Sequence, residues 1–361
     1  MDGLEIIMKN IDPLFWNKKK VFITGHTGFK GSWLALWLTS MGAEVFGYAL
    51  EPDTNPNLFN VLGIEALLRK SCIADIRDFK KLKAAIQEFN PDMVIHMAAQ
   101  PLVRYSYDYP LETYEVNVMG TANLLESLRG IGSVKATVIV TTDKCYDNKE
   151  WEWGYRETDP MGGHDPYSSS KGCAELVTSA YRNSFFYNDK SNNSIASARS
   201  GNVIGGGDWS NDRLVPDVIN ACIQNTKLVM RNPNSTRPWQ HVLEPLSGYL
   251  ILLQALFNNG DKYASSWNFG PNDSDNFTVK DISTLLTKAW GAKLEEKILS
   301  NQPHEANFLK LDCSKSKQHL GWYPKWDTKK SIEMIVRWHK DFILKKDVKK
   351  LSLEQINEYM S

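Results

Sequence analysis

Two short runs in the middle of the chain carry the side chains that could move protons on a bound alcohol. The first run places a hydroxyl, a carboxyl and an amine side by side, at Thr142, Asp143 and Lys144. The second places Tyr167 and Lys171 one helical turn apart, on the same face of a helix. An ammonium favours a neighbouring phenolate, so we expect Lys171 to lower the pKa of Tyr167 from its usual ~10. Such a tyrosine could accept a proton from an alcohol while hydride leaves the same carbon.

A glycine-rich turn near the N-terminus predicts a dinucleotide site. Residues 21–23 are typical of a buried parallel strand, and residues 32–41 have the pattern of a helix. Gly25, Gly28 and Gly31 lie between them. In this setting the first glycine permits a tight turn, the second lets a pyrophosphate approach the backbone, and the third lets helix and strand pack closely. The pyrophosphate then rests at the positive N-terminus of the helix.

Composition excludes several classes of partner. The chain has 361 residues, 42% of them hydrophobic, which is enough for one large or two ordinary domains. Lysine plus arginine and aspartate plus glutamate both number 42, and no basic block occurs, which argues against a nucleic-acid or membrane-surface partner. The five cysteines have no zinc-site spacing, so we expect no metal and reduced thiols in the cytoplasm. The longest apolar run, 249–257, is too short to span a bilayer. Residues 1–10 do not have the pattern of a signal peptide, and we interpret them as a dispensable extension with Met8 as a second possible start.

Strand and helix signals alternate through the first half of the chain, which predicts an α/β fold with a Rossmann-type, doubly wound parallel sheet. Ligands of such sheets bind at the carboxyl ends of the strands. The further strands are expected at 45–48, 71–74, 93–97, 137–140 and 195–199, and the further helices at 79–89, 117–128 and 167–181. We assign residues 1–18 to an N-terminal extension, 19–200 to an NAD-binding domain with a later segment of about 240–272 returning to it, and 201–361 mainly to a smaller mixed α/β domain that binds substrate.

Four motifs together resemble the extended short-chain dehydrogenase/reductase family. They are the glycine turn at 24–31, the strand end at 96–100, the run 117–121, and Tyr167 with Lys171. Within that family, the run 142–144 with Arg199 and Asn202 resembles the nucleotide-sugar 4,6-dehydratases. The runs 142–148, 153–157 and 237–242 are most similar to the CDP-glucose 4,6-dehydratases, and the likeness extends from about residue 15 to the C-terminus.

The resemblance implies a redox-neutral dehydration. Tyr167 would take the proton of the sugar 4-hydroxyl as hydride passes from C4 to NAD, with Thr142 orienting the oxygen and Lys171 holding the nicotinamide ribose. Asp143 would protonate the departing C6 hydroxyl if burial raises its pKa, and the hydride would return to C6. Lys144 stands where the dTDP-glucose enzymes carry a glutamate, so it is either the base at C5 or an electrostatic stabiliser of the enolate.

The residues expected to hold the cofactor favour NAD over NADP. No Lys or Arg lies between Lys30 and Arg69 to bind a 2′-phosphate. The family's ribose-binding aspartate aligns with Ala49, which leaves Glu51 or Asp53 as substitutes. The resemblance implies that, besides Tyr167 and Lys171, the cofactor is bound by Gly25, Thr27, Gly28, Phe29, Lys30, Gly31, Asp75, Ile76, Ala98 and Ala99.

The implied partner is CDP-glucose or a similar nucleotide sugar, used to make deoxysugars for a surface polysaccharide. Two family helices, here 117–128 and 167–181, would pair with those of a second copy in a homodimer. Two alternatives stay open: another dehydratase or epimerase, acting on UDP-N-acetylhexosamine or dTDP-glucose, and a non-catalytic NAD-binding scaffold. An epimerase would not need Asp143 and Lys144, and a scaffold usually loses the Tyr/Lys pair. The expected substrate-binding residues are Gln100, Arg104, Asn202, Arg213 and Arg237.

Overall fold

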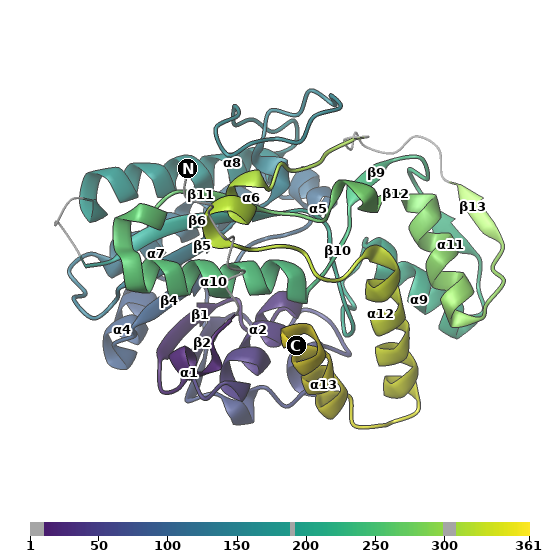
Figure 1. Cartoon of the computed structure of the whole chain (residues 1–361), viewed down its shortest axis with the longest axis horizontal. Helices are drawn as coiled ribbons and strands as arrows, with labels where there is room; N and C mark the ends of the chain where they lie inside the picture. The colour runs from purple at the N-terminus through teal and green to yellow at the C-terminus, as the bar shows by residue number, and fades with distance from the viewer. Residues whose placement is uncertain (1–10, 188–191, 299–307) are drawn as a thin grey trace, which may run out of the picture.

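A seven-stranded parallel sheet lies at the centre of the computed structural model, which describes residues 11–187, 192–298 and 308–361 (Figure 1). Its strands lie in the order β11-β6-β5-β4-β1-β2-β3, and every neighbouring pair is parallel. The order reverses between β1 and β4, and such reversals are where ligands bind in open α/β sheets. The predicted fold class is therefore confirmed. The strands are β1 (Lys20–Thr24), β2 (Glu44–Ala49), β3 (Lys70–Ile73), β4 (Met93–His96), β5 (Ala136–Val140), β6 (Ser194–Ser200) and β11 (Ser266–Phe269).

Helices cover both faces of the sheet because successive strand residues point to opposite sides. In β1, Val21 packs into one apolar cluster and Phe22 into another, and both side chains are fully buried. The first cluster joins the sheet to α2 (Phe29–Ser40), α10 (Leu243–Asn259) and α13 (Val348–Met360). The second joins it to α4 (Phe79–Phe89) and α7 (Gly120–Leu128). α8 (Pro166–Tyr181) packs beside α7.

Element boundaries follow the predictions closely, with two informative differences. α4 spans the predicted residues 79–89. α2 begins at Phe29, three residues before the predicted start, because Gly28 already serves as its N-cap. The predicted helix 117–128 is two elements, a π-helix η2 (Glu115–Met119) followed by α7.

A smaller lobe lies beside the sheet, at the right of Figure 1. Helices α9 (Leu214–Gln224), α11 (Val279–Trp290) and α12 (Thr328–Ile343) share an apolar cluster, and short strands lie around them. Those strands are β8 (Leu228–Met230), β9 (Thr236–Pro238), β12 (Asn276–Thr278) and β13 (Glu296–Ile298), paired as β12 with β9 and β13 with β8.

The N-terminal region is part of the packed structure from helix α1 (Pro13–Trp16) onward. Trp16 is fully buried, and Phe15 packs edge-on against Phe257 of α10. The predicted extension at 1–10, including Met8, lies outside the described residues.

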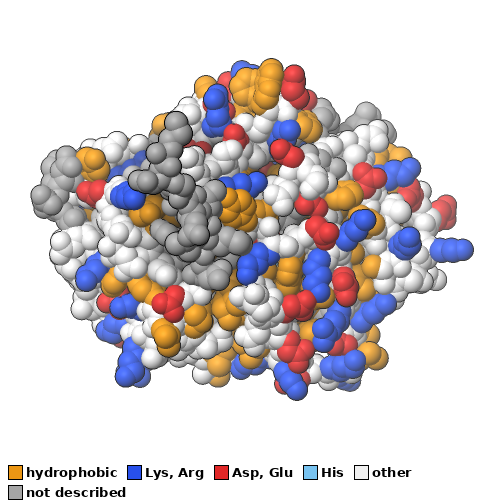
Figure 2. Space-filling view, in the orientation of Figure 1, with side chains coloured by type: hydrophobic (Ala, Val, Ile, Leu, Met, Phe, Trp, Pro, Cys, Tyr) orange, Lys and Arg blue, Asp and Glu red, His pale blue; other side chains and the backbone are white. Residues whose placement is uncertain are grey.

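In the part of the chain that the structure describes, every helix is too short or too polar to cross a membrane. On the face seen in Figure 2, positive and negative side chains are interspersed, in keeping with the zero net charge.

Candidate active site

One cavity of about 510 Å³ collects nearly all the predicted site residues at the carboxyl ends of the strands. Every predicted catalytic, cofactor-binding and substrate-binding residue lines it except Gln100. The Gln100 amide instead donates to the Thr113 hydroxyl (2.9 Å) and to the Leu102 carbonyl (3.1 Å). These bonds turn it toward α6 (Pro110–Tyr114), so the structure does not bring Gln100 into the cavity.

The glycine turn has the tight geometry that its sequence predicts. Gly25 has a φ of +79°, and a Cβ there would lie 2.7 Å from the Ala98 nitrogen. A Cβ on Gly31 would lie 2.0 Å from the Gly25 carbonyl oxygen. The first and third glycines are thus required by the turn and by close packing. Gly28 caps α2 without a side-chain hydrogen bond, so backbone N–H groups at the helix N-terminus open on the cavity.

Asp75 follows β3 and lines the cavity. The N-cap of α4 is Asp78, whose carboxylate accepts from the Lys81 amide (3.0 Å), so Asp75 does not serve as that cap. The Arg77 guanidinium lies 2.6 Å from the Asp75 carboxylate and holds its pKa below the usual value.

The run after β5 places the carboxyl group of Asp143 in a buried position. Thr142 precedes the 3-10 turn η3 (Asp143–Cys145), and its hydroxyl donates to Asp143 Oδ1 at 2.8 Å. Asp143 is 1% exposed, and its Oδ2 accepts no hydrogen bond from the described residues. Burial raises the pKa of Asp143, as we expected for a proton donor. Lys144 is half-buried and lines the same cavity.

The environment of Tyr167 corrects one prediction. α8 starts at Pro166, with Asp165 capping the Ser168 amide at 2.9 Å, and this start brings Tyr167 to the cavity. Burial raises the pKa of Tyr167 to about 12, which a hydrogen bond with Thr142 only partly offsets. The prediction that Lys171 lowers the pKa of Tyr167 is therefore wrong for the protein without bound cofactor or substrate. The loss of water around the phenolate outweighs the interactions that stabilise it.

Lys171 is itself shifted by burial. Desolvation lowers its pKa to about 8, opposed by Glu175 one turn further along α8. Glu175 is buried and pairs with Arg199 of β6 at 2.8 Å. Its carboxylate also accepts from Ser197 at 2.7 Å, so this pair joins the floor of the site to the sheet.

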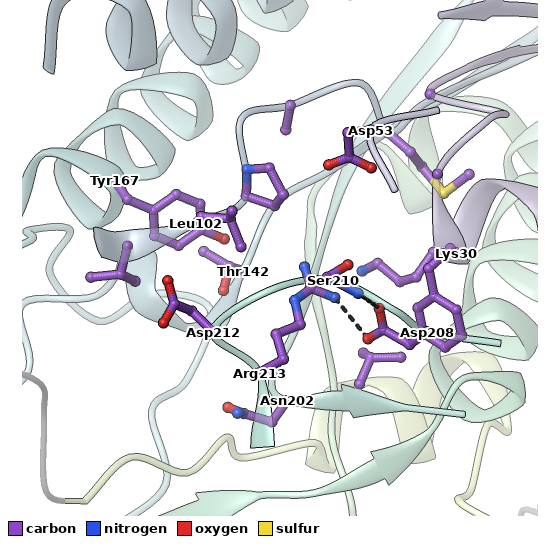
Figure 3. A pocket seen from close by; sticks show the side chains of 18 of the residues that line it. Lys30, Asp53, Leu102, Thr142, Tyr167, Asn202, Asp208, Ser210, Asp212 and Arg213 are labelled. Atoms are coloured by element: carbon purple, nitrogen blue, oxygen red, sulfur yellow. Dashed lines mark hydrogen bonds and ion pairs between the residues drawn. The ribbon is translucent and has the colours of Figure 1, made fainter. Parts of the chain in front are cut away.

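Lys30 adds a further cation to the cavity (Figure 3). Its amine points toward Arg213 and lies 3.5 Å from the Ser200 hydroxyl. Burial, together with the smaller effects of the charges of Lys171 and Arg213, lowers the pKa of Lys30 to about 7.

The far wall of the cavity contains charged residues that sequence reasoning missed. Arg213 pairs with Asp208 at 3.2 Å (Figure 3). Asp212 lies 3.3 Å from Arg104 and 2.8 Å from Arg231. Asp208 and Asp212 lie in the glycine-rich segment 201–212 that follows β6. That segment was the sequence signal that could have identified them as cavity residues. Nothing local to Arg231 marks it, because only the fold brings β8 to this wall. Asn202 and Arg237 line the same cavity.

Comparison with known proteins shows the family to which the chain belongs. The family model described as GDP-mannose 4,6 dehydratase matches residues 22–335. A CDP-glucose 4,6-dehydratase of Salmonella typhimurium is 54% identical over 355 residues, which are 97% of this chain and 99% of the relative. A GDP-mannose 4,6-dehydratase of Vibrio cholerae is 27% identical over 85% of this chain and 90% of its own length.

A solved structure shares the fold. The dTDP-glucose 4,6-dehydratase of Streptomyces venezuelae, crystallised with NAD, superimposes with a TM-score of 0.79 at 22% identity, covering 91% of this chain and 98% of its own. The family-model match and the Salmonella relative together show that the chain belongs to the GDP-mannose 4,6-dehydratase family, the branch of the extended short-chain dehydrogenases/reductases that its motifs resemble.

Proposed function

We propose that this chain is an NAD-dependent CDP-glucose 4,6-dehydratase, a lyase that converts CDP-glucose to CDP-4-keto-6-deoxyglucose and water. The observation that carries the proposal is the 54% identity with the Salmonella enzyme of that name over almost the whole of both chains. A GDP-mannose 4,6-dehydratase and a UDP-glucose 4-epimerase reach only 27% and 24%. The product would supply deoxysugar synthesis for a surface polysaccharide.

The residues of the glycine turn fit NAD as the cofactor. Backbone N–H groups at the start of α2 suit its pyrophosphate, and the close approach at Gly25 keeps that region free of side chains. Near the end of β2 the cavity is lined by the acidic Glu51 and Asp53, which suit ribose hydroxyls and disfavour a 2′-phosphate. Asp75 and Ile76 would contact the adenine, and Ala98 and Ala99 would pack against the dinucleotide. When bound, NAD accepts a hydride from C4 of the sugar and returns it to C6.

Tyr167 is proposed to take the proton of the sugar 4-hydroxyl, with Thr142 holding that oxygen. Its raised pKa means that the phenol needs added positive charge to ionise near neutral pH, and Arg213 is a cation that lowers this pKa in the structure. Lys171 is proposed to hold the nicotinamide ribose. Asp143 is proposed to protonate the departing C6 hydroxyl, because burial raises its pKa and so favours the protonated form, and because its Oδ2 accepts no hydrogen bond from the residues that the structure describes. Lys144 is proposed as the base that removes the C5 proton.

The substrate is proposed to lie between the sheet and the smaller lobe. Arg213 and Arg237 would bind the diphosphate through their forked N–H groups, and Arg104 and Asn202, which line the same cavity, would contact the substrate as well. In the proposed domain arrangement, residues 19–200 bind NAD and residues 201–361 mainly bind the nucleotide sugar. A segment of about 240–272 returns to the NAD-binding domain.

We also propose that two copies pair through η2, α7 and α8. An exposed apolar face supports this: Leu111 is 78% exposed, Met119 55% and Leu176 61%, on helices that contact one another. Burial of such a face against its symmetry mate is typical of a two-fold dimer. The enzyme is placed in the cytoplasm, where its five free cysteines would stay reduced.

A panel of nucleotide sugars tests the proposal. The protein is incubated with NAD and CDP-, dTDP-, GDP- or UDP-glucose, and the 4-keto-6-deoxy sugar is detected by its absorbance in alkali. CDP-glucose should react at least about tenfold faster than the others. Tyr167→Phe should lower the rate by about 10²–10⁴ without changing thermal stability. Product from another sugar alone would reassign the substrate, and no product from any sugar would favour a scaffold.

A further inference from the structure

Three arginines on the substrate side of the cavity, Arg104, Arg213 and Arg231, are already paired with carboxylates of their own chain. Asp212 is central to this arrangement, because its carboxylate lies 2.8 Å from Arg231 and 3.3 Å from Arg104. Arg231 follows β8 in the smaller lobe, whereas Arg104 lies on α5 (Val103–Asp108), which follows β4 of the central sheet. One carboxylate thus joins the two walls between which the substrate is proposed to lie.

Asp212 has an unusual backbone conformation for a residue other than glycine. Asp212 has a φ of +59°, in the left-handed region that few residues other than Gly, Asn and Asp adopt readily. It lies next to Arg213 on the segment that crosses the cavity (Figure 3). The side chains of Arg104 and Asp212 are 41% and 43% exposed, so water screens their ion pair and a competing anion can reach it.

We infer that Asp212 is a displaceable stand-in for the substrate diphosphate: its carboxylate occupies Arg104 and Arg231 until the nucleotide sugar takes them over. This inference rests on the proposed function. A diphosphate carries more charge than a carboxylate and offers more acceptor oxygens to guanidinium groups, so it is the stronger partner once it is bound. Asp212 then lowers the affinity for nucleotides, and Arg231 joins the set of substrate-binding residues.

The substitution Asp212→Asn isolates the charge. Asparagine tolerates the left-handed backbone nearly as well as aspartate, so the variant removes the negative charge without imposing strain. Asp217→Asn is the matched control. Asp217 lines the same cavity, and among the described residues its carboxylate forms an ion pair with Arg231 alone, at 3.5 Å, so its substitution leaves the link between the two walls in place.

The test is calorimetric titration with CDP and, separately, with inorganic pyrophosphate, at constant ionic strength and with saturating NAD to occupy the glycine turn. Asp212→Asn should bind both probes about three- to tenfold more tightly than the parent protein, as expected for a partly screened ion pair. Asp217→Asn should gain clearly less. In an Arg104→Gln background the gain from Asp212→Asn should shrink, because one partner of the carboxylate is gone.

Three results would overturn the inference: weaker binding by Asp212→Asn, an equal gain from Asp217→Asn, or a gain that is unchanged in the Arg104→Gln background. The two probes separate this inference from the proposed function. Failure of the parent protein to bind CDP, with pyrophosphate binding still strengthened by Asp212→Asn, would reject the CDP assignment and keep the role of Asp212.

Discussion

At the scale of single residues, burial is the main influence on the groups proposed to move protons. Asp143 and Tyr167 both have raised pKa values because their charged forms lose water. For Asp143 this favours the proposed role, since an acid must hold its proton. For Tyr167 it opposes the proposed role, so the site depends on cations near the phenol.

The role of Lys144 is tested by following the hydrogen at C5. If Lys144 is the C5 base, Lys144→Ala should still form the 4-keto sugar but should lose solvent exchange at C5 by about 10²–10⁴. The measurement is deuterium incorporation from heavy water by NMR, beside acid-quenched detection of the 4-keto sugar. Exchange at the parent rate would show that another group moves the proton and would leave Lys144 as an electrostatic stabiliser.

The residues that could be predicted are those carried by local motifs. Tyr167 and Lys171 are set by helical spacing, and the three glycines by a strand–turn–helix unit. Arg231 could not be predicted, because it meets Asp212 and the cavity only when segments distant in the sequence fold together. Gln100 was misplaced since its neighbours in space, rather than its position after β4, decide where its amide points.

At the scale of elements, the C-terminal helix α13 is fastened to α10 through a buried carboxyl group. Glu244 accepts hydrogen bonds from the Trp326 amide at 2.7 Å and from the Tyr359 hydroxyl at 2.6 Å. Burial nevertheless raises the pKa of Glu244 to about 7, so the folded chain holds this proton more tightly than the unfolded chain.

This shift predicts a dependence of stability on pH. Because the folded pKa is raised, the contribution of Glu244 is fully present below its unfolded pKa of about 4.5 and is lost as pH rises through about 7. Between those limits the parent protein should lose about 3 kcal/mol of unfolding free energy relative to Glu244→Gln, which carries no titrating group there. Urea unfolding of both proteins from pH 4.5 to pH 8 measures the difference, and parallel profiles would contradict it.

Element boundaries were predictable where the chain carries its own stop signals. α4 is bounded by Asp78, an N-cap, and by Asn90, which adopts the left-handed conformation after the last helical residue. The start of α2 was predicted too late because helical conformation continues through a glycine turn that reads as loop. The π-helix η2 has no local signature and lies where several helices pack together.

At the scale of the whole molecule, the alternation of strands and helices was enough to predict the sheet. The alternation does not determine where a later segment joins the sheet as the edge strand β11, or how the segments of the small lobe come together.

The apolar face over α8 predicts the assembly state. Leu176→Glu would place two buried charges in a two-fold interface and should weaken the proposed dimer by at least about 100-fold. Leu344→Glu is the matched control, because Leu344 is similarly exposed, at 65%, but lies at the end of α12. Sedimentation of the three proteins over a range of concentrations measures the effect. A parent protein that sediments as a monomer, or equal behaviour of both variants, would reject this interface.

The docking of α13 also has a consequence for synthesis on the ribosome. Tyr359 packs edge-on against Trp37 of α2, and the Trp37 indole N–H donates to Met360 Sδ at 3.4 Å. The helix α2 is translated early, yet its Trp37 makes these contacts with residues translated much later, Met360 being 323 positions further along the chain. A nascent polypeptide would therefore leave this side of Trp37 open to chaperones until α13 has left the exit tunnel.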